Sequence, residues 1–167
     1  MHYQNNPIVE AQMLIRKPIE QVFHAFVDPK VTYNFWFTKS SGLLEVGKLV
    51  TWEWEMYNIS TQIFVKEIIK NKFIKIEWNN PITTFEFHFI SHANNTTYVN
   101  IKNYGFSQSG SELIEIIKDN TAGFTTVLAG LKSYLEHGIN LNLISDKFIA
   151  HQNINKINLS EWQKSKK

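Results

Sequence analysis

The longest periodic stretch of the chain lies between Ser109 and Gly138. Apolar residues recur there at steps of three and four, which is the spacing of one face of an α-helix. The polar run Asp119-Asn120-Thr121 interrupts this stripe and indicates a kink or local break. The stripe is too wide to face water, so we expect the helix to lie across a sheet. Its members are Leu113, Ile117, Phe124, Leu128, Leu131 and Leu135.

Both ends and two interior positions of this helix carry further signals. Ser109 followed by Glu112 is typical of a capping box at the start, and Gly138 is typical of a C-terminal stop. Gly123 and Gly130 lie seven residues apart on one face, and each costs roughly 1 kcal/mol relative to Ala in a helix interior. Either close packing against a neighbour or room for a ligand above the helix would explain them.

The segment before this helix begins with a strand and two short helices. Loose alternation predicts a strand over residues 8–16, and Pro18 stands near the start of the first helix. Asp28-Pro29 ends that helix, because a residue before proline avoids helical geometry. A second short helix is expected over residues 30–37, which end in an aromatic cluster.

Between Ser40 and Phe106 the period of the pattern changes to two. Large residues at 50, 52, 54 and 56 alternate with polar ones, and similar runs cover residues 61–69, 73–78, 85–90 and 97–104. Short polar links between the runs favour hairpins and an antiparallel meander. The chain is therefore expected to be an α+β fold, with a curved antiparallel sheet of six or seven strands and a long C-terminal helix.

Length and composition limit the remaining possibilities. A chain of 167 residues suits one domain over 1–167, with 139–167 as a less regular C-terminal extension. The formal net charge of +2 gives no indication of a nucleic-acid partner. No apolar run is long enough to enter a membrane, and the N-terminus lacks the pattern of a secretory signal. The expected location is the cytoplasm.

Residues that could carry catalysis or bind a metal are few. The absence of cysteine excludes disulfides, thiolate catalysis and Cys-based zinc sites. His88 and His92 are four apart on an expected strand, which separates them by about 13 Å along it. Glu53 and Glu55 alternate with tryptophans, so we expect them to face water. His24 has no partner readable in the sequence. No catalytic residue, metal or cofactor is predicted.

Aromatic residues are abundant, at 14% of the chain, and gather on the predicted inner faces. They would make either an ordinary aromatic core or the lining of a hydrophobic cavity, which is a natural small-molecule site. The candidate lining comprises Trp52, Trp54, Trp78, Phe87 and Phe89 on the sheet, Phe124, Leu128 and Leu131 on the long helix, and Trp36 at one end.

Several short motifs resemble those of a known family. They lie at residues 15–18, 22–29 and Trp36, at Gly47, Trp78 and 104–106, and at 123–128 with Leu131 and 134–136. Together they resemble, over about residues 8–138, the family similar to the C-terminal domain of the heat-shock protein 90 ATPase activator. The resemblance implies the helix-grip fold of START lipid-binding domains and birch-pollen-allergen-like proteins, in which the last helix closes a hydrophobic cavity.

Two departures from the family pattern bear on function. Phe124 stands where the family commonly has Trp, which changes the size of the implied cavity. The chaperone activator has a further N-terminal domain, which we do not expect in a chain of 167 residues. The resemblance supplies no catalytic residues.

Three hypotheses about function follow. The first is binding of a small hydrophobic molecule, lipid-like or polyketide-like, in an internal cavity. The second is a chaperone-related protein-interaction module, and the third is an enzyme that uses polar groups of the cavity. The expected partners are a small hydrophobic molecule or a chaperone, with no nucleic acid and no membrane insertion.

Overall fold

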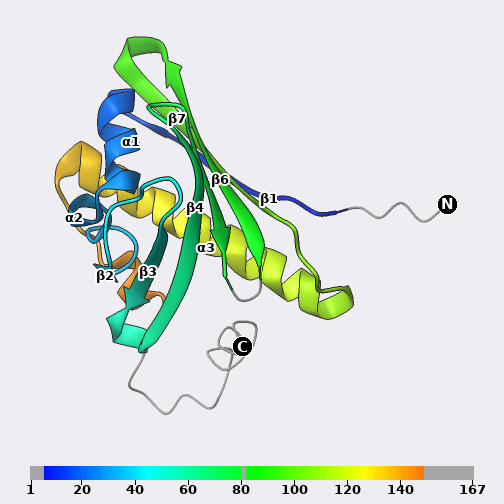
Figure 1. Cartoon of the computed structure of the whole chain (residues 1–167). Helices are drawn as coiled ribbons and strands as arrows, with labels where there is room; N and C mark the ends of the chain where they lie inside the picture. The colour runs from blue at the N-terminus through cyan, green and yellow to red at the C-terminus, as the bar shows by residue number, and fades with distance from the viewer. Residues whose placement is uncertain (1–5, 80–81, 149–167) are drawn as a thin grey trace.

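The computed structural model describes residues 6–79 and 82–148 of the chain. Seven strands precede one long helix, and the short helices are inserted after the first strand and at the end (Figure 1). In chain order the elements are β1 (Val9–Ile15), α1 (Ile19–Val27), α2 (Pro29–Thr32), β2 (Lys39–Ser40), β3 (Leu49–Trp54), the 3₁₀ turn η1 (Glu55–Tyr57), β4 (Ile59–Ile69), β5 (Phe73–Trp78), β6 (Thr83–His92), the turn η2 (Ala93–Asn95), β7 (Thr96–Tyr104), α3 (Gly110–His137) and α4 (Leu143–Asp146).

The strands form one antiparallel sheet in the order β1-β7-β6-β5-β4-β3-β2. Consecutive strands from β2 to β7 are neighbours, as the short polar links predicted, and β1 pairs with β7, where Val9 lies opposite Asn103. The prediction of an α+β fold with an antiparallel sheet is confirmed. The two-residue strand β2 lay outside the predicted runs, because a strand this short has no period to detect.

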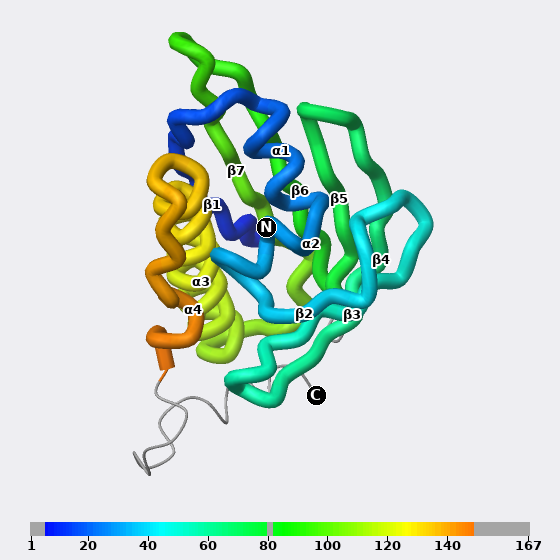
Figure 2. Tube along the Cα trace, turned by 90° about the vertical axis from the view of Figure 1, so that its left-hand side faces the viewer, coloured from blue at the N-terminus to red at the C-terminus, as the bar shows by residue number. Residues whose placement is uncertain are grey.

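The alternation along the strands separates a buried face from an exposed one. On β6, Phe85, Phe87 and Phe89 are buried, and the residues between them are half-buried on the other side. The helices α1, α2 and α3 cover the buried face (Figure 2). Burial of these apolar side chains is the main stabilising contribution of such a layer.

Helix α3 is continuous from Gly110 to His137, so the predicted break at residues 119–121 is wrong. The polar run has another role there. Asn120 donates a hydrogen bond to the Oδ1 atom of Asn103 (2.9 Å), and the Nδ2 atom of Asn103 donates to the carbonyl of Thr84 (3.1 Å). Asn103 is fully buried, and its amide needs these partners. The interruption of the apolar stripe is therefore a polar contact between helix and sheet.

The two ends of α3 differ in how well the sequence predicted them. Ser109 is the N-cap residue, but its side chain makes no cap hydrogen bond, so the predicted capping box is wrong. The next residue, Gly110, has a φ of 59°, and the first turn lacks the regular geometry that a capping box requires. Gly138 adopts the left-handed conformation, and its N–H donates to the carbonyl of Tyr134 (2.8 Å), which confirms the predicted stop.

Helix α3 also lies along the free edge of β1 (Figure 2). Lys132 donates to the carbonyl of Leu14 (2.9 Å), and the backbone N–H of Arg16 donates to Glu136 (2.7 Å). Burial acts to raise the pKa of Glu136, but the hydrogen bonds from Lys132 and Arg16 outweigh it and hold this pKa below its usual value. Side chains of α3 thus satisfy backbone groups of the edge strand.

Two predicted elements are shorter than expected. Helix α2 ends at Thr32 instead of continuing to residue 37. Phe35, Trp36 and Phe37 are all buried, and one face of a helix cannot bury three consecutive residues. Strand β3 ends at Trp54, and the turn η1 that follows buries Tyr57 instead of Met56.

The described part of the C-terminal extension folds back onto the turn η1. The Tyr57 hydroxyl donates to the carbonyl of Ser145 (3.0 Å) and accepts from the backbone N–H of Phe148 (3.3 Å). The rings of Tyr57 and Phe148 are 5.9 Å apart. The rest of the extension, residues 149–167, lies outside the described residues. Within residues 6–79 and 82–148, no helix is long and apolar enough to cross a membrane.

Candidate functional site

The aromatic residues predicted to line a site gather between the sheet and α3. Trp36 reaches this layer from the segment after α2, and its ring lies 5.0 Å from that of Trp52 on β3. Phe37 stacks on the same indole, because its ring lies 4.7 Å from that of Trp52 at an interplanar angle of 20°. The two aromatic residues of an irregular segment therefore pack on one inward-facing tryptophan. We call these three residues the tryptophan cluster.

The layer continues from the tryptophan cluster to the helix. Trp78 lies 5.7 Å from Trp52, and Phe85 lies 5.0 Å from both Trp78 and Phe124 of α3. Trp54 lies 6.1 Å from Trp78. These distances fall within the range of favourable aromatic pairs. A chain of ring contacts thus joins β3, β5, β6 and α3.

The other predicted lining residues lie at different places in the layer. Phe87 contacts the tryptophan cluster, since its ring is 6.0 Å from that of Trp36. Phe89 packs instead against α1, where Phe23 is 5.3 Å away. Leu128 and Leu131 are fully buried on α3. The ligand-binding role of the nine predicted residues stays a prediction.

Sequence reasoning left several aromatic residues of this layer out of the predicted site, among them Phe26, Phe37 and Phe85. Phe37 and Phe85 make the ring contacts described above, and Phe26 of α1 lies 5.3 Å from Phe87. Phe85 could have been found, because it alternates with Phe87 and Phe89 on one strand. The positions of Phe26 and Phe37 depend on how α1 and the following segment dock, which the local pattern does not encode.

One polar atom in this layer has no partner. Trp52 is 1% exposed, and its Nε1 atom has no hydrogen-bond acceptor among the described residues. A buried indole N–H usually has an acceptor. The tryptophan cluster therefore contains a buried donor without an acceptor among the described residues.

The two interior glycines of α3 have different surroundings. A Cβ atom built on Gly130 would lie 3.2 Å from the Cβ of Phe35 and 3.3 Å from its carbonyl oxygen. Gly130 therefore allows close packing of α3 against the segment that carries Trp36. A Cβ atom on Gly123 would meet nothing within 4 Å. Of the two explanations that the sequence left open, close packing holds for Gly130 only.

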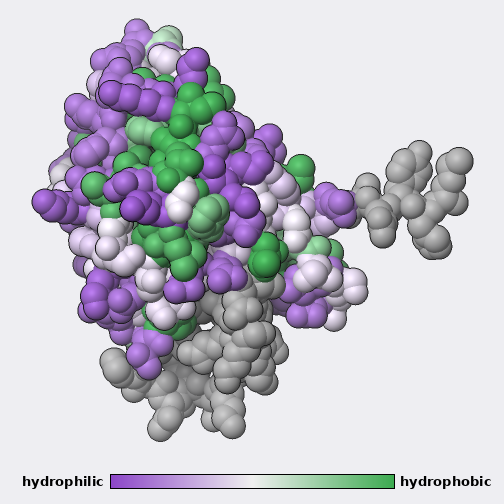
Figure 3. All heavy atoms as spheres, in the orientation of Figure 1, coloured by the Kyte–Doolittle hydropathy of each residue, from purple (hydrophilic) through white to green (hydrophobic). Residues whose placement is uncertain are grey.

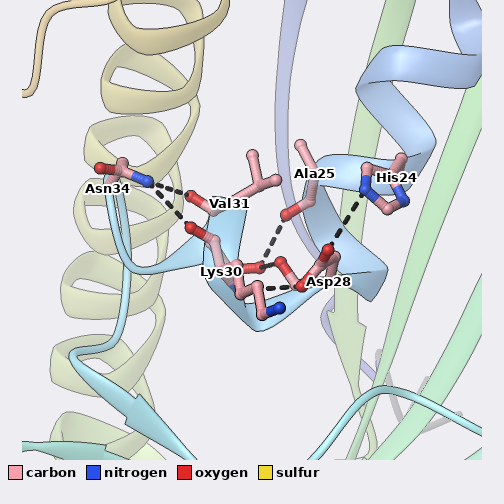
Figure 4. Close-up of polar contacts among 7 residues, drawn as sticks. His24, Ala25, Asp28, Lys30, Val31 and Asn34 are labelled. Carbon is pink, nitrogen blue, oxygen red and sulfur yellow. Dashed lines mark hydrogen bonds and ion pairs between the residues drawn. The ribbon is translucent and has the colours of Figure 1, made fainter.

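The segment that carries Trp36 is held by polar contacts at the junction of α1 and α2 (Figure 4). Thr32 donates to the carbonyl of Ala25 (2.7 Å), and Asn34 donates to the carbonyl of Lys30 (3.1 Å). His24 pairs with Asp28 at 3.3 Å, so the statement that His24 has no readable partner is wrong. The spacing of four residues on a helix was the available signal.

The exposed face of the sheet carries a separate polar network around Glu86. Its carboxylate accepts from Tyr104 (2.7 Å) and lies 2.9 Å from His88 and 3.5 Å from Lys75. Burial acts to raise the pKa of Glu86, but the hydrogen bonds and the charge of Lys75 lower it overall. A carboxylate held in its ionised form is a weak base, so Glu86 is poorly suited to acid–base catalysis. The network instead stabilises the pairing of neighbouring strands.

The other polar candidates lie apart from the aromatic layer. Glu53 forms an ion pair with Lys39 at 3.3 Å, and Glu55 is exposed in η1. His88 contacts Glu86, and His92 is exposed at the end of β6. The side chains of Glu53 and Glu55 therefore do not converge on one point, and neither do those of His88 and His92.

The family model described as Activator of Hsp90 ATPase homolog 1-like protein matches residues 16–136. The chain belongs to this Hsp90-activator-like family. The resemblance noted in the sequence is thereby confirmed, and the match covers α1 to α3 with the whole tryptophan cluster. None of the curated proteins compared with the chain matches it.

Several solved structures have the same fold as this protein. Protein SSP2350 from Staphylococcus saprophyticus is 28% identical, with a TM-score of 0.71, and the match covers 81% of this chain and 96% of that one. The Aha1 dimer from Colwellia psychrerythraea is 17% identical, with a TM-score of 0.67 and coverage of 79% and 98%. The helix-grip fold is therefore confirmed.

A third structure is that of DynU16, described as a putative protein in the dynemicin biosynthetic locus. It is 18% identical, with a TM-score of 0.70, and the match covers 80% of this chain and 48% of that one. At this level of identity the likeness concerns the fold alone.

Proposed function

We propose that this protein binds a small, flat hydrophobic molecule between the tryptophan cluster and helix α3. The observation that carries the proposal is the continuous layer of aromatic rings from Trp36 and Trp52 to Phe124. Ring faces at this density match the mostly apolar lining of small-molecule sites. The proposal extends to the polyketide-like compounds expected from the sequence, since these are also flat and largely apolar.

Binding requires that a ring contact in the layer opens. The rings of Trp36 and Phe37 are the ones we expect to shift, because they stand on a segment outside the sheet and the helices. The backbone of that segment stays held by its hydrogen bonds. Each aromatic pair contributes about 0.5–1.5 kcal/mol beyond burial of its area. A flat ligand that inserts between two rings replaces one such contact by two of the same kind, which offsets the cost of separation.

The test is titration with N-phenyl-1-naphthylamine, an uncharged dye whose emission reports an apolar environment. Leu128→Phe places extra volume at a fully buried position of α3, so we expect dye affinity to fall about tenfold, or roughly 1.4 kcal/mol. Ile114→Phe is the matched control, because Ile114 is 65% exposed on the same helix. Denaturant unfolding shows whether either variant has lost its core.

Saturable binding by the parent and by Ile114→Phe, with weaker binding by Leu128→Phe, supports the proposal. Dye binding that does not saturate, or that is equal in all three proteins, refutes it. Native mass spectrometry of freshly purified protein adds an independent test, since a retained small molecule would appear as added mass.

A second candidate function is contact with the chaperone Hsp90, which the family description suggests. A specific observation favours it. Leu43 and Val46 in the loop before β3 are 48% and 59% exposed, and Leu49, the first residue of β3, is 55% exposed. Apolar residues interrupt the mostly hydrophilic surface of the face that carries this loop (Figure 3). Exposed apolar groups mark protein-interaction sites. Co-purification with Hsp90 that Leu49→Lys abolishes would favour this function.

A further inference from the structure

The indole N–H of Trp52 is a polar group inside the aromatic layer. Its Nε1 atom is buried without an acceptor among the described residues. Leaving a buried donor unpaired destabilises a protein, and natural sites rarely keep such a group without a role.

The immediate surroundings of Trp52 account for the lack of an acceptor among the described residues. Phe37, Trp36 and Trp78 surround its ring at 4.7, 5.0 and 5.7 Å. Thr61, its cross-strand neighbour on β4, directs its hydroxyl to the carbonyl of Asn79 (3.5 Å). These neighbours therefore offer ring carbon or a hydroxyl that is already engaged.

Two other buried polar atoms lack partners in the described part of the chain, and their positions differ. Asn100 lies on the outer, half-buried side of β7, and Gln108 lies in the loop before α3. Both unpaired atoms are oxygen acceptors. Among the described residues, Trp52 alone combines an unpaired donor with aromatic neighbours, so it points to a ligand that is aromatic and carries an acceptor.

We infer that Trp52 selects ligands that present a carbonyl or phenolic oxygen on a flat aromatic skeleton. The inference rests on the proposed function and names the ligand class for the same site. Ring faces of the tryptophan cluster would stack on the skeleton, and the indole N–H would donate to its oxygen. A site built around a buried donor rejects an analogue that lacks the acceptor, because the donor is then left unpaired.

The experiment uses two probes of nearly the same shape, 2-acetylnaphthalene and 2-isopropenylnaphthalene. They differ in a C=O group against a C=CH₂ group. Isothermal titration of the parent is expected to show tighter binding of the ketone by about tenfold. In Trp52→Phe a smaller aromatic ring remains and the donor is lost, so the two probes should bind with equal affinity.

A second measurement covers the case in which Trp52→Phe does not fold. The parent labelled with ¹⁵N-tryptophan gives one indole N–H signal per tryptophan, and single Trp→Phe variants of the other tryptophans assign that of Trp52 by elimination. The ketone should move this signal downfield as the hydrogen bond forms, and the alkene should not. A signal that responds equally to both probes overturns the inference.

The outcomes separate the two proposals. If neither probe binds saturably to the parent, the proposed function fails and the inference fails with it. If both probes bind the parent equally well, the site exists but Trp52 does not select an acceptor. If Trp52→Phe keeps the preference for the ketone, another group provides the donor and the inference is overturned.

Discussion

The two interior glycines of α3 allow one substitution to be tested in two environments. Replacing either by Ala gains about 1 kcal/mol of helix propensity. At Gly123 the new Cβ atom meets no heavy atom within 4 Å. Gly123→Ala should therefore raise the free energy of unfolding by about 0.5–1 kcal/mol.

At Gly130 the same change meets the backbone of Phe35. The new Cβ atom would lie 3.2 Å from the Cβ of Phe35 and 3.3 Å from its oxygen, closer than ordinary contact. Phe35 cannot easily retreat, because its N–H donates to the carbonyl of Thr32 (3.1 Å) and its ring packs against Phe26 at 5.7 Å. Overpacking of this kind costs about 1–3 kcal/mol. Gly130→Ala should therefore lower the free energy of unfolding by up to about 2 kcal/mol.

The assay is unfolding of the parent and both variants in guanidinium chloride. The propensity gain is common to the two variants, so their difference of about 1–3 kcal/mol isolates the steric term at Gly130. Unchanged m-values show that the denatured states are comparable. If Gly130→Ala is as stable as Gly123→Ala, the close approach of α3 to the Phe35 segment is wrong.

Three further substitutions test other parts of the fold. Leu131→Ala should cost about 2–5 kcal/mol in the same unfolding assay, and a loss below roughly 1 kcal/mol would place this side chain outside the core. Tyr57→Phe removes the hydroxyl that holds residues 144–148. It should speed hydrogen exchange at Phe148 while sheet amides keep their protection, and unchanged exchange would contradict this. Glu136 has a lowered pKa, so its ionised form contributes stability above the usual carboxyl pKa, and this contribution is lost as the pH falls through the lowered value. The stability gap between the parent and Glu136→Gln should therefore shrink on acidification, and a gap independent of pH would refute the assignment.

Much of the fold follows from the sequence because backbone periodicity is local. A period of two identified β5 at its observed bounds and placed Phe85, Phe87 and Phe89 on one face. A period near 3.6 identified α3, and Gly138 marked its end. The family resemblance added the helix-grip arrangement, which local patterns alone do not specify.

The tertiary structure decided how distant residues meet. It converted the expected break at Asn120 into a hydrogen bond with Asn103, and it brought Phe35 against Gly130 but left Gly123 open. It also packed the ring of Trp52 among other aromatic rings and left its N–H without an acceptor among the described residues. Period and propensity report which way a side chain faces, but its partner depends on strand register and on how separate elements dock. That is why the aromatic character of the layer could be read from the sequence, whereas its unpaired donor could not.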